Sequence, residues 1–73
     1  MKNEIVDILE IAWTEPIVFR RDSFRASGGS ISRKYLANLD SQGKGPEGKA
    51  ILNGKVCYPA DNFFQWLRGR IKA

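Results

Sequence analysis

Residues 43–50 read GKGPEGKA and match the spacing G-x-x-x-x-G-K of a nucleotide-binding loop. In such a loop, backbone N–H groups and the Lys hold the phosphates, and a Ser or Thr after the Lys binds magnesium. Ala50 stands at that last position and has no hydroxyl. The motif also needs a strand before it and a helix after it, whereas the flanking sequence predicts the reverse order. We therefore expect a Gly-rich connection, in which Lys44 and Lys49 either contact DNA phosphates or are simply solvated.

The chain offers little else for catalysis or metal binding. It has no His and a single cysteine, Cys57, so it can form neither an internal disulfide nor a Cys/His zinc set. The carboxylates are scattered, and no base can be paired with Ser27, Ser30 or Ser32. We expect no enzymatic activity, no cofactor, no metal and no small-molecule ligand. Cys57 is predicted to be a small buried side chain.

Composition indicates one small folded unit. The 73 residues are 42% hydrophobic and include two Trp, two Tyr and four Phe, which suffices for a core. No apolar run approaches the roughly 20 residues of a membrane span. The acidic start is unlike the basic start of a secretory signal. We expect a cytoplasmic protein without membrane contact, associated with the nucleoid when bound to DNA.

Charge divides the chain into two parts. Residues 1–15 hold one Lys against four carboxylates, a net charge of −3, and the remainder has a net charge of +7. The basic part suits a polyanionic partner. We therefore divide the chain into an acidic segment, residues 1–15, and a domain at residues 16–73. The apolar residues of 4–13 fit a helix or a strand, so the structure of that segment stays open.

Two helices joined by a short turn are predicted next. Residues 20–27 could form two helical turns that end at Gly28 and Gly29. A second helix starts after Ser32, a good N-cap, with Ile31 packing on Leu36, and it ends at Gly43. A three-residue turn containing Gly between two helices is the spacing of a helix-turn-helix, whose second helix enters the DNA major groove by its N-terminal end.

The second helix should have one buried and one free face. At 100° per residue, Tyr35, Leu36 and Leu39 share the core side. The opposite side is free for a partner and holds Arg33, Lys34, Ala37 and Ser41. The periodicity of the later aromatic residues also favours the core for Tyr58, Phe63, Phe64 and Trp66, rather than stacking on unpaired bases.

A β-hairpin and a closing helix complete the pattern. Asn53-Gly54 predicts a type I′ turn, because both residues accept positive φ. This turn sets the register Ile51–Val56, Ala50–Cys57, Leu52–Lys55 and leaves Lys55 at a basic tip. Pro59 and Asp61 then begin a helix whose apolar side carries Phe63, Phe64, Leu67 and Ile71. The expected fold is α+β, mainly helical: a small winged helix-turn-helix with one hairpin wing.

Residues 31–67 resemble the winged helix-turn-helix of the excisionase and AlpA-like prophage regulator family, which is similar to the MerR DNA-binding domain. The resemblance lies in the Ser-Arg opening of the second helix, a loop ending near Pro46, the NGKVCYP wing and the closing Asp61, Trp66 and Leu67. It implies binding to double-stranded DNA as an excisionase or transcriptional regulator, with Lys55 at the wing tip and recognition-helix positions Ser32, Arg33, Lys34, Ala37 and Asn38. The short polar stretch RRDSFRAS and residues 1–15 depart from the family pattern.

The basic residues receive two kinds of role. Arg33 can donate two hydrogen bonds to O6 and N7 of a guanine. Phosphate contacts are expected from Arg20, Arg21, Lys34 and Lys44. Several copies are expected on adjacent sites. The alternative is a protein-interaction module, in which residues 1–15 and the closing helix dock on an integrase or another partner; a contiguous basic face would favour DNA.

Overall fold

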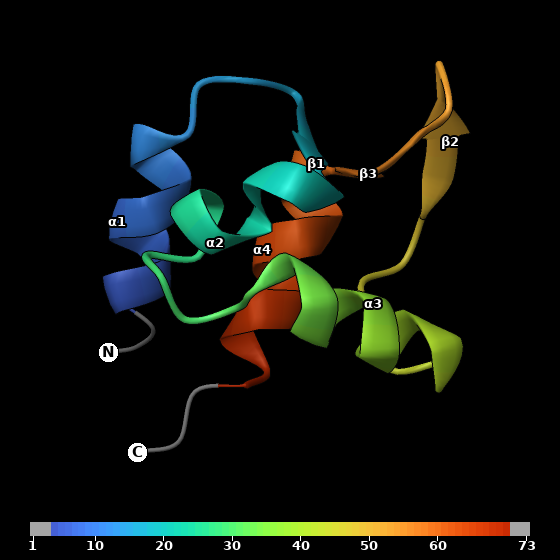
Figure 1. Ribbon diagram of the computed structural model, residues 1–73. Helices are drawn as coiled ribbons and strands as arrows, with labels where there is room; N and C mark the ends of the chain where they lie inside the picture. The colour runs from blue at the N-terminus through green and yellow to red at the C-terminus, as the bar shows by residue number, and fades with distance from the viewer. Residues whose placement is uncertain (1–3, 71–73) are drawn as a thin grey trace.

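The computed structural model describes residues 4–70 and has the expected α+β class with a β-hairpin (Figure 1). Within this part of the chain the order is α1 (Glu4–Ala12), β1 (Ile17–Phe19), the 3-10 helix η1 (Arg20–Asp22), α2 (Ser23–Ala26), α3 (Arg33–Ser41), β2 (Ala50–Leu52), β3 (Lys55–Pro59) and α4 (Ala60–Arg68). The predicted two helical turns at residues 20–27 form η1 followed by the short helix α2. The predicted role of Ile71 in the core lies outside the described residues.

Most of the stretch 4–13, which the sequence left open between helix and strand, forms α1. Val6, Leu9 and Trp13 recur with helical spacing and pack against the core, with Val6 buried. The Trp13 indole N–H donates to the Ile17 carbonyl at 3.1 Å, which ties the end of α1 to β1. Arg68 of α4 donates hydrogen bonds to both Asp7 and Glu10 of α1. The acidic segment therefore shares one core with the rest of the described chain.

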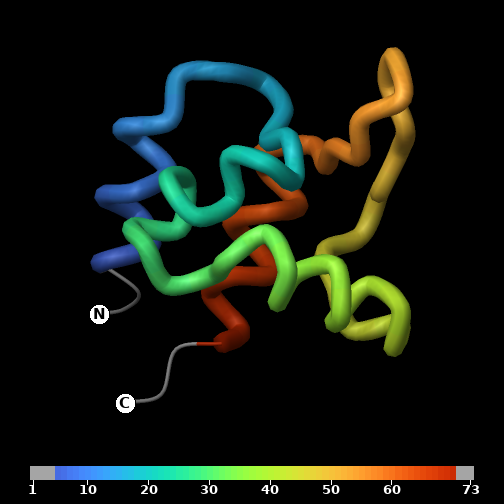
Figure 2. Tube along the Cα trace, in the orientation of Figure 1, coloured from blue at the N-terminus to red at the C-terminus, as the bar shows by residue number. Residues whose placement is uncertain are grey.

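The hairpin is part of a three-stranded antiparallel sheet of order β1-β3-β2. The predicted register is confirmed, with Ile51 opposite Val56 and the turn residues Asn53 and Gly54 at φ values of 53° and 77°. The third strand, β1, pairs with β3, and the sequence did not predict this pairing. Buried Val18 and Tyr58 are partners in that pairing, which covers only residues 57–59 of β3. The first part of β3 therefore projects with β2 as a wing, away from the helices (Figure 2).

Hydrogen bonds from serine hydroxyls shape the turn between α2 and α3. The buried Ser27 hydroxyl accepts from the Ile31 N–H at 2.9 Å, and Ser23 donates to the Ile31 carbonyl at 3.4 Å. The predicted cap is confirmed, since Ser32 Oγ accepts from the Tyr35 N–H at 3.1 Å. Ile31 thus enters the core beside Leu36, as the predicted staple requires.

The C-terminal end of α3 closes as the sequence predicted. Gly43 has a φ of 74°, the Gly43 N–H donates to the Asp40 carbonyl at 3.0 Å, and the Lys44 N–H donates to the Leu39 carbonyl at 2.8 Å. This pair of bonds is the Schellman arrangement, which satisfies carbonyls that a helix end otherwise leaves without donors. The chain then turns sharply toward α4.

The core gathers side chains from the four α-helices, from β1 and β3, and from the turn before α3: Val6, Val18, Ala26, Ile31, Leu36, Tyr58, Phe63, Phe64 and Leu67. The prediction for Tyr35 is wrong, because this side chain is 43% exposed. Tyr35 lies at the edge of the buried stripe of α3, where its hydroxyl accepts from Arg70 Nη2 at 2.8 Å. Trp66 packs on the core only in part, and its indole N–H donates to the Lys44 carbonyl at 2.8 Å.

Candidate nucleic-acid interface

Three separate elements bring basic side chains to one depression of about 260 Å³. Arg33 is the first residue of α3, Lys55 follows the wing turn, and Arg20 and Arg21 belong to η1. Phe19 and Val56 supply its apolar lining. The sequence predicted these basic residues one by one; the tertiary structure places them around a single concave surface. We call Arg21, Arg33 and Lys55 with this depression the basic face.

The positive charges of this face are largely free of internal partners. Within residues 4–70, Arg33 and Lys55 of this face form no ion pair and are exposed. The same holds for Lys34 and Lys44, which do not line the depression. The Arg21 guanidinium lies over the Phe19 ring, 4.9 Å from its centroid, and its distance to the Asp22 carboxylate is 3.9 Å. A stacked guanidinium is held in place while its N–H groups remain accessible at the ring edge. These groups can therefore meet an external anion without first breaking a strong internal contact.

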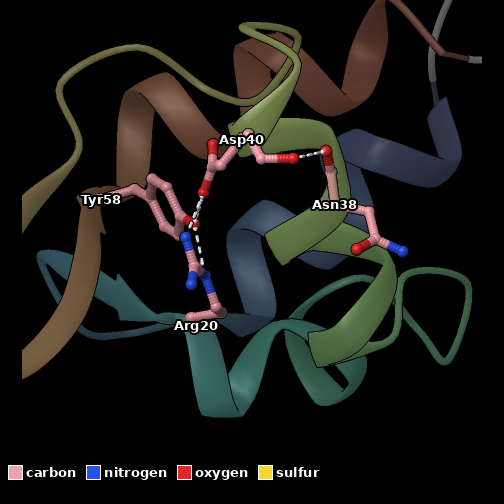
Figure 3. Close-up of polar contacts among 5 residues, drawn as sticks. Arg20, Asn38, Asp40 and Tyr58 are labelled. Carbon is pink, nitrogen blue, oxygen red and sulfur yellow. Dashed lines mark hydrogen bonds and ion pairs between the residues drawn. The ribbon is translucent and has the colours of Figure 1, made fainter.

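Arg20 differs from its neighbours because its side chain is engaged inside the protein. Its Nη2 lies 2.6 Å from Asp40 Oδ2, and its Nε donates to the Tyr58 hydroxyl at 3.1 Å. The Tyr58 hydroxyl in turn donates to Asp40 Oδ2 at 2.5 Å (Figure 3). We call these three residues the Asp40 triad. They join η1, the last turn of α3 and β3, and so hold α3 against the sheet.

Burial and hydrogen bonding shift the pKa values within the triad. Burial and the hydrogen bond to Asp40 raise the pKa of Tyr58 to about 12, although the nearby Arg20 cation opposes the shift. Burial lowers the pKa of Arg20, but the contacts with Tyr58 and Asp40 outweigh this effect and place it above its ordinary value. The tyrosine is therefore neutral and the arginine is charged at physiological pH. The Asp40 carboxylate accepts a hydrogen bond from each of them.

The predicted recognition positions lie along the outer side of α3. Ser32, Arg33, Lys34 and Asn38 are exposed, and Ala37 is half-buried. The spacing i, i+4 puts Arg33 in one row with Ala37 and Lys34 in a second row with Asn38. The side-chain amide of Asn38 points away from the Asp40 triad (Figure 3). The Ser32 hydroxyl already accepts the hydrogen bond that caps α3. Any contact between Ser32 and a ligand would use this same hydroxyl.

Lys44 lies apart from the basic face. It follows the C-terminal end of α3, a helix of nine residues and therefore about 13 Å long, whereas Arg33 stands at the other end. Neither Lys44 nor Lys34 lines the depression. The predicted phosphate contacts therefore fall into two groups: Arg20 and Arg21 at the depression, and Lys34 and Lys44 along and beyond α3.

The Gly-rich stretch that resembled a phosphate loop joins α3 to β2, the reverse of the strand-to-helix order of such loops. A Cβ on Gly45 would lie 1.8 Å from Asp40 Oδ1, so glycine is required where the loop crosses the triad. The Glu47 carbonyl accepts from Asn62 Nδ2 at 3.1 Å, and Pro46 is buried. These contacts hold the loop against α3 and α4. Packing, rather than phosphate binding, therefore explains the Gly- and Pro-rich composition of the loop.

Sequence reasoning missed the Asp40 triad, because its members are 18 to 38 residues apart and no local pattern links them. One signal was present: Asp40 follows Leu36 by four positions and therefore lies toward the buried side of α3. The prediction for Cys57 is confirmed, since this side chain is buried in β3. Among residues 4–70, no three His, Cys, Asp or Glu side chains group in a way that could hold a metal ion.

Comparisons of the chain with protein-family models, with curated proteins and with solved structures gave no match. The resemblance to excisionases and AlpA-like regulators therefore stays a prediction from sequence. In the part of the chain that the structure describes, no helix has the length and hydrophobicity needed to cross a membrane.

Proposed function

We propose that this protein binds double-stranded DNA, with the N-terminal end of α3 in the major groove and the wing on the flanking backbone or minor groove. The observation that carries the proposal is the convergence of Arg21, Arg33 and Lys55 from three elements on one depression. A basic face built from a helix start and a hairpin tip suits duplex DNA, because the helix fits the major groove while the hairpin reaches the adjacent strand. By its resemblance, the protein would act as an excisionase or transcriptional regulator of phage type.

In this proposal the basic residues have two roles, base recognition and phosphate contact. Arg33 has the position and the planar pair of donors needed to read a guanine. Arg21, Lys34, Lys44 and Lys55 would neutralise phosphates, which adds affinity without sequence information. Four such contacts would give a slope of about −4 for the logarithm of the binding constant against that of the salt concentration. Arg20 is left out of the contact set, because two of its donor groups serve Asp40 and Tyr58.

The decisive experiment compares Arg33→Ala with Arg25→Ala by fluorescence anisotropy, on a duplex selected from a randomised pool and on random duplex. Arg25 is a matched control: it is 67% exposed and stacks over Trp13 at 4.7 Å, away from the wing. Arg33→Ala should lose about 1–3 kcal/mol on the selected duplex and much less on random DNA. Lys55→Ala should weaken both duplexes alike and reduce the salt slope by about 1.

Equal losses for Arg33→Ala and Arg25→Ala on both duplexes would contradict the assigned role of Arg33. A wild-type protein that binds neither duplex at low salt would contradict the proposed function itself.

A further inference from the structure

The side of α1 that faces away from the core is apolar and uncovered. Ile5, Ile8 and Ile11 are 69%, 65% and 81% exposed. At 100° per residue these three and Ala12 form a stripe about 120° wide, as broad as the buried stripe of an ordinary amphipathic helix. The inward stripe, Val6, Leu9 and Trp13, already packs on the core. A helix that is apolar on both sides is normally covered on both sides, so the outer face of α1 indicates a docking surface.

The exposed stripe continues into a groove. Ile5 lines a hollow of about 680 Å³ between α1, the α2–α3 turn and the end of α4. Its apolar walls are Val6, Leu9, Ile31, Tyr35 and Leu67. The charged residue that lines it is Arg70, whose guanidinium donates to the Tyr35 hydroxyl at 2.8 Å. Tyr35 is exposed, which its position on α3 did not predict, and its side chain lines this hollow. The stripe thus offers a flat apolar surface, and the groove beside it offers space for an inserted side chain.

Charge indicates what kind of segment would cover this surface. Residues 4–15 contain no Lys or Arg and four carboxylates. Only Arg68 forms an ion pair with the carboxylates of α1 in the described chain, and it is shared between Asp7 and Glu10. Two α1 helices packed symmetrically would bring carboxylates against carboxylates, which costs free energy. A complementary partner carries apolar side chains with Lys or Arg beside them.

We propose that the outer face of α1, together with the adjoining groove, binds an amphipathic helix of another protein, whose apolar stripe is flanked by basic residues. Helices of this type place apolar residues at i, i+3, i+4 and i+7 into such a groove. The helix α1 lies on the opposite side of the molecule from the wing (Figure 1). The groove shares no lining residue with the basic depression, so the proposal does not depend on DNA binding.

The test uses the full chain and two designed peptides of about five helical turns with the same leucine stripe. One peptide has Lys beside the stripe and the other has Glu. The readouts are anisotropy of the labelled peptides and changes in the amide NMR signals of the protein. The Lys peptide should bind at least about tenfold more tightly than the Glu peptide, and the affected amides should be those of α1 and of residues 27–31.

Variants locate the surface. Ile8→Ser combined with Ile11→Ser should weaken the Lys peptide by at least about tenfold. Ile51→Ser is the matched control, since Ile51 is 71% exposed but lies on the wing, and it should leave peptide binding unchanged. Circular dichroism should show the same helix content for all three proteins, because the replaced side chains lie outside the core.

Three results with the peptides would overturn the proposal: no binding of the Lys peptide, equal binding of both peptides, or wild-type affinity in the double variant. Analytical sedimentation of the protein without peptide tests whether a second copy of the chain occupies this surface instead. Self-association that disappears in the Ile8→Ser, Ile11→Ser variant would also overturn the proposal, in favour of a head-to-tail contact between copies. A monomeric chain that binds the Lys peptide is the expected result.

Discussion

Asp40→Ala removes the acceptor that Arg20 and Tyr58 share and should lower the free energy of unfolding by about 2–4 kcal/mol. Tyr58 is fully buried, so its hydroxyl would lose its acceptor without access to water, a cost of about 1–3 kcal/mol. The Arg20 side chain is 22% exposed and can turn partly to solvent, which limits its share to about 1 kcal/mol. The Asp40 side chain is only 6% exposed, so both contacts are shielded from solvent.

Urea unfolding followed by the fluorescence of Trp13 and Trp66 measures this loss. A domain of this size has a slope of about 1 kcal/mol per molar urea, so the midpoint should fall by about 2–4 M if the wild-type midpoint allows it. Asp40→Asn keeps an oxygen that can accept from Tyr58 and should fall between the wild type and Asp40→Ala. Asp61→Ala is the matched control, because Asp61 is exposed in the first turn of α4 and should cost at most about 1 kcal/mol.

A double-mutant cycle tests the reasoning more directly. Tyr58→Phe and Asp40→Ala remove the same hydrogen bond, so their effects should fail to add by about 1 kcal/mol or more. Additive effects, or an Asp40→Ala cost no greater than that of Asp61→Ala, would show that the triad does not hold α3 to the sheet.

Two further predictions concern the same region. The folded-state pKa of Tyr58 is about 12, above its ordinary value of 10, so the folded state holds this proton more tightly. The resulting stability is fully present below pH 10 and should be lost as the pH rises to 12, by about 2–3 kcal/mol; urea unfolding across this range should show a larger fall in the wild type than in Tyr58→Phe, and equal falls would contradict the shift. Gly45→Ala forces a methyl group onto the Asp40 carboxylate, whereas a Cβ on Gly43 meets nothing within 4 Å and suffers only from its φ of 74°. Thermal unfolding should therefore rank Gly45→Ala below Gly43→Ala, and the opposite order would contradict the close approach of the loop to Asp40.

Local signals predicted most of the elements. Ser32 marks the start of α3 because its hydroxyl accepts from an N–H in the first turn of the same helix. Gly43 marks the end because it adopts the positive φ that closes a helix. Asn53-Gly54 set the hairpin register for the same reason, since a two-residue turn leaves one way to pair the strands. Each of these interactions spans only a few residues, so the sequence contains all the information they need.

Contacts between residues far apart in the sequence could not be predicted without the tertiary structure. The apolar residues of 4–13 suited a helix and a strand equally, and packing against the core decided for α1. Arg20 had the same appearance in the sequence as Arg21, yet Asp40 and Tyr58 engage one and leave the other at the basic face.

By itself, the sequence determined the α+β class, the helix-turn-helix spacing, the hairpin and the basic character of residues 16–73. Only the tertiary structure decided that Arg21, Arg33 and Lys55 share one surface, and that α1 covers the core while exposing a second apolar face. The physical reason is range: caps and tight turns form between near neighbours, whereas the gathering of charges and the burial of one helix face depend on where the whole chain places distant elements.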